Sequence, residues 1–167
     1  RFLFTSIFAS AYFLFVGAFV QLNIIPFAID SLGLEDVGGV NLFLLTALGV
    51  GLGSFLAGRL SKGFVELGVV PFAALGIALC CFFLDAFSVH LYVVSVVMFI
   101  IGIFGGLYVV PVDTFIQVGS PRMFRAENIA AANFLGFVGV LFASGLLVID
   151  AQLFGITPAE GFSLFGS

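Results

Sequence analysis

Long uncharged stretches, separated by short charged ones, are the feature that most constrains this chain. They cover residues 2–29, 37–58, 67–84, 86–112 and 128–149. A helix needs about 20 predominantly apolar residues to cross the hydrocarbon core of a bilayer, and each stretch is close to or above that length. We therefore expect five membrane-spanning helices. Their expected limits are about 3–29, 38–59, 66–86, 90–117 and 126–150.

The composition agrees with a membrane protein built only from helices. Hydrophobic residues make up 62% of the chain and charged residues 8%, with a mean hydropathy of +1.33, whereas soluble domains are about 25% charged. Strands of a membrane barrel alternate apolar and polar residues, and runs such as VVSVVMFIIGIFGGLYVV (93–110) do not alternate. With 5 cations in the chain, we also expect no nucleic-acid partner.

A sixth helix is expected to start near residue 158. In TPAE (157–160), Thr157 can cap the helix, Pro158 suits its first position and Glu160 can complete a capping box. We expect the chain to stop inside this helix, so the last helix is truncated. Ser120 followed by Pro121 gives the same start signal for the fifth span.

Positive charge falls on one side of this predicted topology. The five cations, all on that side, are Arg1, Arg59, Lys62, Arg122 and Arg125. Of the acidic residues only Glu66, Asp113 and Glu127 share it. Lysine and arginine in short loops mark the cytoplasmic side of a membrane. We therefore expect a multi-pass protein whose Arg59/Lys62 and Arg122/Arg125 loops are cytoplasmic.

Small residues recur at a spacing of four in two of the spans. Gly49, Gly53 and Ala57 share one face of the second span, and Gly102 and Gly106 share a face of the fourth. Such faces let helix backbones approach closely. We expect these residues to serve helix packing, and the functional alternative is that the two faces slide past each other during a conformational cycle.

Polar residues at membrane depth are few. Gln21 and Asn23 lie in QLNIIPF of the first span, next to Pro26. An amide in hydrocarbon must face protein or a wet cavity, so these two either line a substrate cavity or form an interhelical hydrogen bond. Asp113, in VVPVDTFIQ, lies one to two turns inside the cationic side. It needs a partner there, and the alternatives are an ion pair with a nearby cation or a proton-coupling role.

The sequence offers little for catalysis or metal binding. Cys80 and Cys81 are adjacent within an apolar run, and the single histidine, His90, lies at a span boundary. Adjacent cysteines rarely pair, and two alone do not make a metal site. We expect no enzyme activity, no metal and no cofactor.

Two stretches resemble a known family. GLGSFLAGRLSKGFVELGVVPFAALGIAL (51–79) resembles the eighth helix, cytoplasmic signature loop and ninth helix of a major facilitator superfamily transporter. AGRLSKGFVELGVVP (57–71), together with VPVDTFIQVGSPRMFRAENIAAANF (110–134), is similar to the bacterial lysophospholipid transporters of that superfamily. The match runs from helix seven to the start of helix twelve. It implies that residues 1–167 are the carboxy-terminal six-helix half of this all-α integral membrane fold, whose partner is a missing amino-terminal six-helix half.

The resemblance also implies an activity and a set of residues. The expected function is secondary transport, by alternating access, of lysophospholipid (chiefly lysophosphatidylethanolamine) between the leaflets of a bacterial inner membrane. By position, Gln21 and Asn23 would line the central cavity from the seventh helix. The cytoplasmic gate and its loops would contain Arg59, Lys62, Asp113, Gln117, Arg122 and Arg125.

Three alternatives stay open at this point. The chain could belong to a major facilitator transporter of another small solute, to a membrane enzyme of lipid metabolism, or to a membrane-anchoring domain. Members of the lysophospholipid group are sometimes fused to an acyl-carrier-protein synthetase and 2-acylglycerophosphoethanolamine acyltransferase, so a fused or neighbouring acyltransferase is an expected partner.

Overall fold

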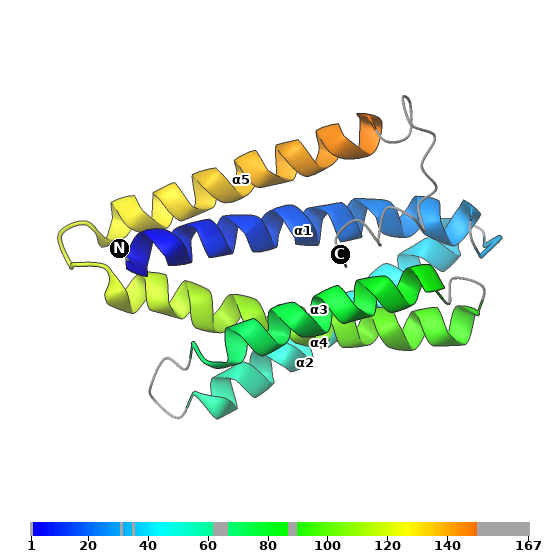
Figure 1. Cartoon of the computed structure of the whole chain (residues 1–167), viewed down its shortest axis with the longest axis horizontal. Coiled ribbons are helices and arrows are strands. Elements are labelled where there is room, and N and C mark those ends of the chain that lie inside the picture. Colours follow the sequence, from blue (N-terminus) through cyan, green and yellow to red (C-terminus); the bar gives the residue numbers. More distant parts are fainter. Residues whose placement is uncertain (1, 31, 35, 62–66, 87–89, 150–167) are drawn as a thin grey trace.

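The computed structural model of the chain describes residues 2–30, 32–34, 36–61, 67–86 and 90–149. These residues form five α-helices joined by short connections, and they include no strand (Figure 1). In chain order the helices are α1 (Phe2–Asp30), α2 (Asp36–Leu60), α3 (Val69–Ala86), α4 (Leu91–Gly119) and α5 (Arg125–Ile149). The expected all-helical architecture is thus confirmed over the described residues.

Four of these helices are long and apolar enough to cross a membrane, namely α1, α2, α4 and α5. The apolar helix α3 is shorter, with 18 residues, or about 27 Å, near the lower limit for a span. It begins at Val69 rather than at the expected residue 66, because Leu67 and Gly68 lie in a turn closed by the Val70 amide donating to the Leu67 carbonyl (3.1 Å). The sixth helix expected from residue 158 lies outside the described residues.

The helix ends follow from local chemistry. After α1, Gly33 adopts the left-handed conformation with φ 62°, and its amide donates to the Ile29 carbonyl (3.1 Å). This arrangement is a common way to end a helix, and glycine adopts it without the steric cost of a Cβ. The start of α5 differs from our expectation, because Ser120 follows the last residue of α4 and α5 begins only at Arg125. The Ser120 hydroxyl donates backwards to the Ile116 carbonyl (2.5 Å) instead of capping α5.

Consecutive helices run in opposite directions, and α1 lies between α5 and the group formed by α2, α3 and α4 (Figure 1). The most extensive helix contacts join α2 to α4 and α1 to α5, followed by α3 with α4. Helices α1 and α4 also contact each other, and this contact joins the α1–α5 pair to the α2–α4 pair. The core contains Phe19, Phe27 and Met98, which are fully buried.

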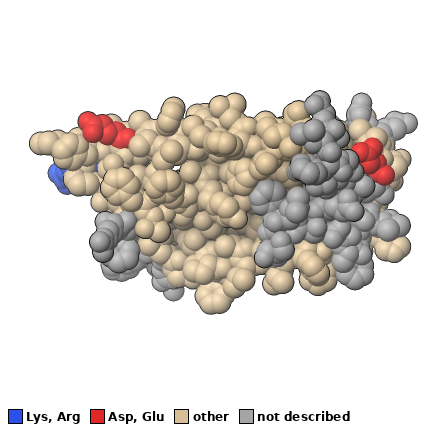
Figure 2. All heavy atoms as spheres, turned by 45° about the horizontal axis from the view of Figure 1, so that its top comes forward, with Lys and Arg blue, Asp and Glu red and all other residues tan. Residues whose placement is uncertain are grey.

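Apart from Asp113, the charged residues in the described part of the chain lie near the two ends of the bundle. On the face that Figure 2 shows, the described residues present no charged side chain along the middle of the molecule, and acidic and basic side chains lie toward its ends. The end that contains Arg59 and the α4–α5 turn is the end where α1 begins (Figure 1). Large apolar side chains cover the flank between; on α5, for example, Phe134, Phe137 and Leu141 are each about 70% exposed. A flank of this kind fits lipid or another helix rather than water.

Helices α2 and α4 cross with their backbones in contact at the four glycines that the sequence singled out. Gly49 and Gly53 on α2 face Gly102 and Gly106 on α4, and all four are buried. A methyl group added to any of them would overlap backbone atoms of the opposite helix. Those atoms belong to Phe99 for Gly49, to Ile103 for Gly53, to Thr46 for Gly102, and to Val50 and Ser54 for Gly106. Only glycine permits this approach without moving a helix.

Gly49→Ala is therefore expected to push α2 away from α4. Overpacking of this kind typically costs 1–3 kcal/mol, so the thermal midpoint of the detergent-solubilised protein should fall by about 5 °C. Gly51→Ala is the matched control, because a methyl group at Gly51 meets nothing within 4 Å. Equal midpoints for the two variants would contradict the close crossing.

Candidate functional site

A large cavity lies among α1, α2, α4 and α5. It has a volume of about 560 Å³, within the usual range for small-molecule sites. Its walls are mainly apolar, and its polar side chains are Gln21, Thr46 and Ser144. Its other lining residues include Phe13, Val16, Ala47, Ile77, Gly102 and Gly105. The cavity thus adjoins the glycine crossing of α2 and α4.

The three polar residues of this cavity differ in what they can offer a ligand. Thr46 and Ser144 use their hydroxyl protons within their own helices, donating to the carbonyls of Leu42 (2.9 Å) and Val140 (3.0 Å). Both hydroxyl oxygens keep acceptor capacity. Gln21 is exposed to the cavity and contributes an amide with both a donor and an acceptor. The cavity can therefore orient one polar group while its other walls contact an apolar one.

Gln21 and Asn23, which the sequence placed together, are separated by the structure. Gln21 lines the cavity, whereas Asn23 is 2% exposed and does not line it. Among the described residues, no buried side-chain nitrogen or oxygen is without a hydrogen-bond partner. A packing role in the core therefore fits Asn23, and the cavity alternative fits Gln21. The residues are two positions apart, so about 200° of helix rotation separates their directions.

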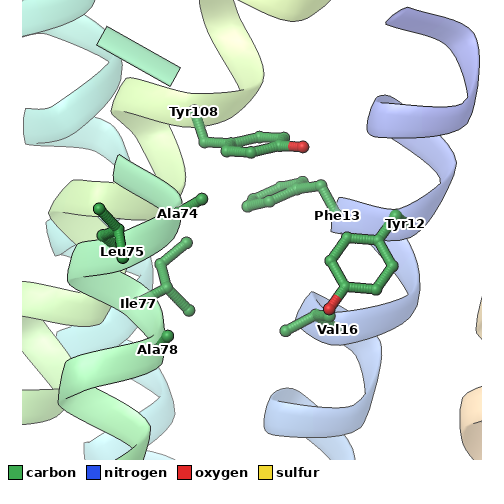
Figure 3. Close-up of a pocket in the computed structure, with 8 residues that line it drawn as sticks. All are labelled: Tyr12, Phe13, Val16, Ala74, Leu75, Ile77, Ala78 and Tyr108. Atoms are coloured by element: carbon green, nitrogen blue, oxygen red, sulfur yellow. The ribbon is translucent and has the colours of Figure 1, made fainter. Parts of the chain in front are cut away.

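A smaller cavity of about 290 Å³ lies between α1, α3 and α4 (Figure 3). The rings of Phe13 on α1 and Tyr108 on α4 stack at one side of it, with centroids 4.9 Å apart and an interplanar angle of 14°. The Tyr108 hydroxyl donates to the Ala9 carbonyl at 3.1 Å. Phe13, Val16 and Ile77 line both cavities, so these side chains form the partition between them.

Asp113 lies on α4 toward the end of the bundle that holds the arginines. It is half-buried, and its Oδ1 accepts a hydrogen bond from the Ser10 hydroxyl of α1 at 3.0 Å. In the part of the chain that the structure describes, it forms no ion pair with Arg59, Arg122 or Arg125. Arg1 and Lys62, the other cations expected on this side, lie outside the described residues.

The other expected gate residues are exposed at the same end. Gln117, Arg122 and Arg125 face outward, and the Arg59 guanidinium lies 5.4 Å from the centre of the Phe55 ring, in the range of a cation–π contact. The α4–α5 turn is fixed by an Asn128 side-chain amide that donates to the Ser120 hydroxyl oxygen (3.1 Å). Among the described residues, several exposed polar side chains thus lie at the arginine-bearing end of the bundle, and no ion pair joins them.

Several of the site residues escaped the sequence analysis. Ser10, Thr46, Tyr108 and Ser144 are isolated polar residues in apolar runs, and any of them could have served only its own helix. Only the pairing of α1 with α4 shows that Ser10 meets Asp113 and that Tyr108 reaches Ala9. Within the described residues there is also no group of three His, Cys, Asp or Glu side chains that could hold a metal ion.

Comparisons with known proteins add no relative, because no family model, curated protein or solved structure matches this chain.

The separation of Gln21 from Asn23 predicts opposite behaviour of their leucine variants. Asn23→Leu removes a buried, hydrogen-bonded amide, so the thermal midpoint of the solubilised protein should fall by about 2–4 °C, corresponding to about 1 kcal/mol. Gln21→Leu changes a side chain that faces the cavity and should leave the midpoint within about 1 °C of that of the parent protein. A larger loss for Gln21→Leu than for Asn23→Leu would reverse the two assignments.

Proposed function

We propose that the chain is the carboxy-terminal half of a major facilitator carrier that moves lysophospholipid between the leaflets of a bacterial inner membrane. The substrate is chiefly lysophosphatidylethanolamine, and the mechanism is alternating access. The observation that carries this proposal is the larger cavity, which lies inside a bundle of membrane-length helices and combines apolar walls with a few separated polar groups.

The pairing of the helices supports a major facilitator half. Each half of that superfamily contains two inverted repeats of three helices. Under this repeat, α1, α2 and α3 correspond to α4, α5 and a sixth helix. The α2–α4 pair therefore corresponds to the α5–α1 pair, and these two pairs have the most extensive contacts among the described helices. The same exchange relates α4, which contacts α2 and α3, to α1, which contacts α5 and would contact a sixth helix.

The chemistry of the cavity favours a lipid with one chain over a polyhydroxylated solute. A sugar needs many hydrogen-bonding groups, because its hydroxyls must replace the water they lose. The described lining instead offers Gln21, Thr46 and Ser144 among apolar side chains. An acyl chain fits the apolar wall, and the amide of Gln21 is available to a glycerol hydroxyl or ester. The ethanolamine headgroup rests on the resemblance of residues 51–79 and 110–134 to lysophospholipid transporters.

Alternating access assigns roles to the ends and the crossing of the helices. The amino-terminal half would close the open side of the cavity and rock against this half. Arg59, Arg122 and Arg125 share one end of the bundle, and the positive-inside rule assigns this end to the cytoplasm. The glycine contact between α2 and α4 gives the cavity a firm wall, since backbone atoms touch there without long side chains.

Transport of labelled lysophosphatidylethanolamine tests this function in spheroplasts that express the full-length protein. Expression should accelerate inward movement of the lipid over an empty vector. Ala47→Trp should reduce this rate at least tenfold, because Ala47 is exposed and lines the cavity. Ala131→Trp is the control, since Ala131 is exposed on α5 and does not line the cavity.

Rates equal to the empty vector for the wild-type protein would overturn the lipid assignment. If Ala47→Trp and Ala131→Trp transport equally well, the cavity among α1, α2, α4 and α5 is not the substrate site.

A further inference from the structure

A carboxylate inside a membrane-spanning helix is the feature that the proposed transport path leaves unexplained. Asp113 lies six residues before the end of α4 at Gly119, which corresponds to about 9 Å along the helix. It lines neither of the two cavities described above. Ionisable residues inside membrane-spanning helices are rare and costly, and they commonly mark ion or proton pathways.

The surroundings of Asp113 supply a single neutral donor. Its hydrogen bond comes from the Ser10 hydroxyl at 3.0 Å. A second hydrogen bond also joins α1 to α4. The Tyr108 hydroxyl donates it to the Ala9 carbonyl at 3.1 Å, and both groups are neutral. The carboxylate charge is therefore held by one hydroxyl, without an opposite charge among the described residues.

The charged residues of the neighbouring helices lie away from Asp113 along the bundle or have other contacts. On α2, Arg59 packs over Phe55, and Asp36 starts that helix at the far end of the bundle. On α5, Arg125 and Glu127 are exposed in the first turn. The remaining titratable groups on the helices packed against α4 are Tyr12 and Asp30 on α1 and Cys80, Cys81 and Asp85 on α3; Asp30 and Asp85 lie at the end opposite Asp113 (Figure 1).

Proton binding would relieve the cost of this charge, which no described cation offsets. An ionised carboxylate loses most of its solvation in a low-dielectric region, and a proton removes that cost where no cation does so. Protonation also changes the helix contact. The bond from Ser10 is charge-assisted while Asp113 is ionised, and such bonds are roughly twice as strong as those between neutral groups. The bond from Tyr108 to Ala9 does not depend on the proton.

We propose that Asp113 is the proton-binding site of this carrier, and that the Ser10–Asp113 hydrogen bond ties α1 to α4 more tightly while Asp113 is ionised. The proton comes from water at the end that holds the arginines, binds one carboxylate oxygen and returns to water, with no covalent bond broken elsewhere. Ser10 is a positioning residue that favours the ionised form. This inference rests on the proposed carrier function, because it assigns the coupling ion to that transport cycle.

Infrared difference spectroscopy of the full-length protein in liposomes, without substrate, tests proton binding directly. Lowering the pH from 8 to 5 should produce a carboxylic acid C=O band that Asp113→Asn abolishes and Glu127→Gln leaves in place. Glu127 is the matched control, because it is a carboxylate exposed at the same end. Ser10→Ala should move the midpoint of this band to higher pH by about one unit, a tenfold increase in proton affinity.

The outcomes separate this inference from the proposed function. A band that persists in Asp113→Asn, or a midpoint unchanged in Ser10→Ala, overturns the proton site even if lysophospholipid is transported. Should Asp113→Asn fail to fold, the Ser10→Ala midpoint decides alone. Conversely, a band with the expected behaviour in a protein that moves no lysophospholipid keeps the proton site and removes the lipid assignment. In a transporting protein, an inward proton gradient should accelerate lipid movement in the wild type and not in Asp113→Asn.

Discussion

The hydrocarbon core of a bilayer solvates neither charges nor open backbone groups, and this constraint organises the whole chain. It requires long helices, because only a helix satisfies all of its backbone hydrogen bonds within one segment. It also favours charge at the ends of the bundle, as one face shows in Figure 2, with Asp113 as the exception among the described residues. Between the ends, helices associate without a hydrophobic driving force, so they depend on close packing and on a few hydrogen bonds. The glycine crossing of α2 with α4 and the two α1–α4 hydrogen bonds are the examples here.

The sequence was sufficient for the parts of the fold that this constraint dictates. The helices lie close to the uncharged stretches, and the glycines at 49, 53, 102 and 106 lie where two backbones touch. It was insufficient where a residue could belong to either of two neighbouring structural elements. Ser120 was expected to start α5, but its hydroxyl bonds back to Ile116 at the end of α4. Leu67 and Gly68 were expected to be at the start of a span and instead form a turn.

The candidate site was less predictable than the fold, for a geometric reason. Gln21 and Asn23 look equivalent in sequence, yet the helix turns one toward the cavity and the other into the core. The partner of Asp113 is 103 residues away in the chain, and no pattern within α4 points to Ser10. Charge complementarity suggested an arginine or Lys62, and among the described residues the helix pairing brings a hydroxyl to the carboxylate. Which polar groups meet is thus decided by how α1 packs on α4.

The sidedness of the two ends is the claim on which the carrier proposal depends. Labelling of single cysteines with a membrane-impermeant thiol reagent tests it in a full-length protein in which Cys80 and Cys81 are replaced. Positions 61 and 123 lie at the end with the arginines, and position 90 lies at the opposite end. Cysteines at 61 and 123 should react only after the cells are opened, and a cysteine at 90 should react in intact spheroplasts. Labelling of 61 and 123 from opposite faces of the membrane would contradict the topology and, with it, the assignment of the chain to a major facilitator carrier.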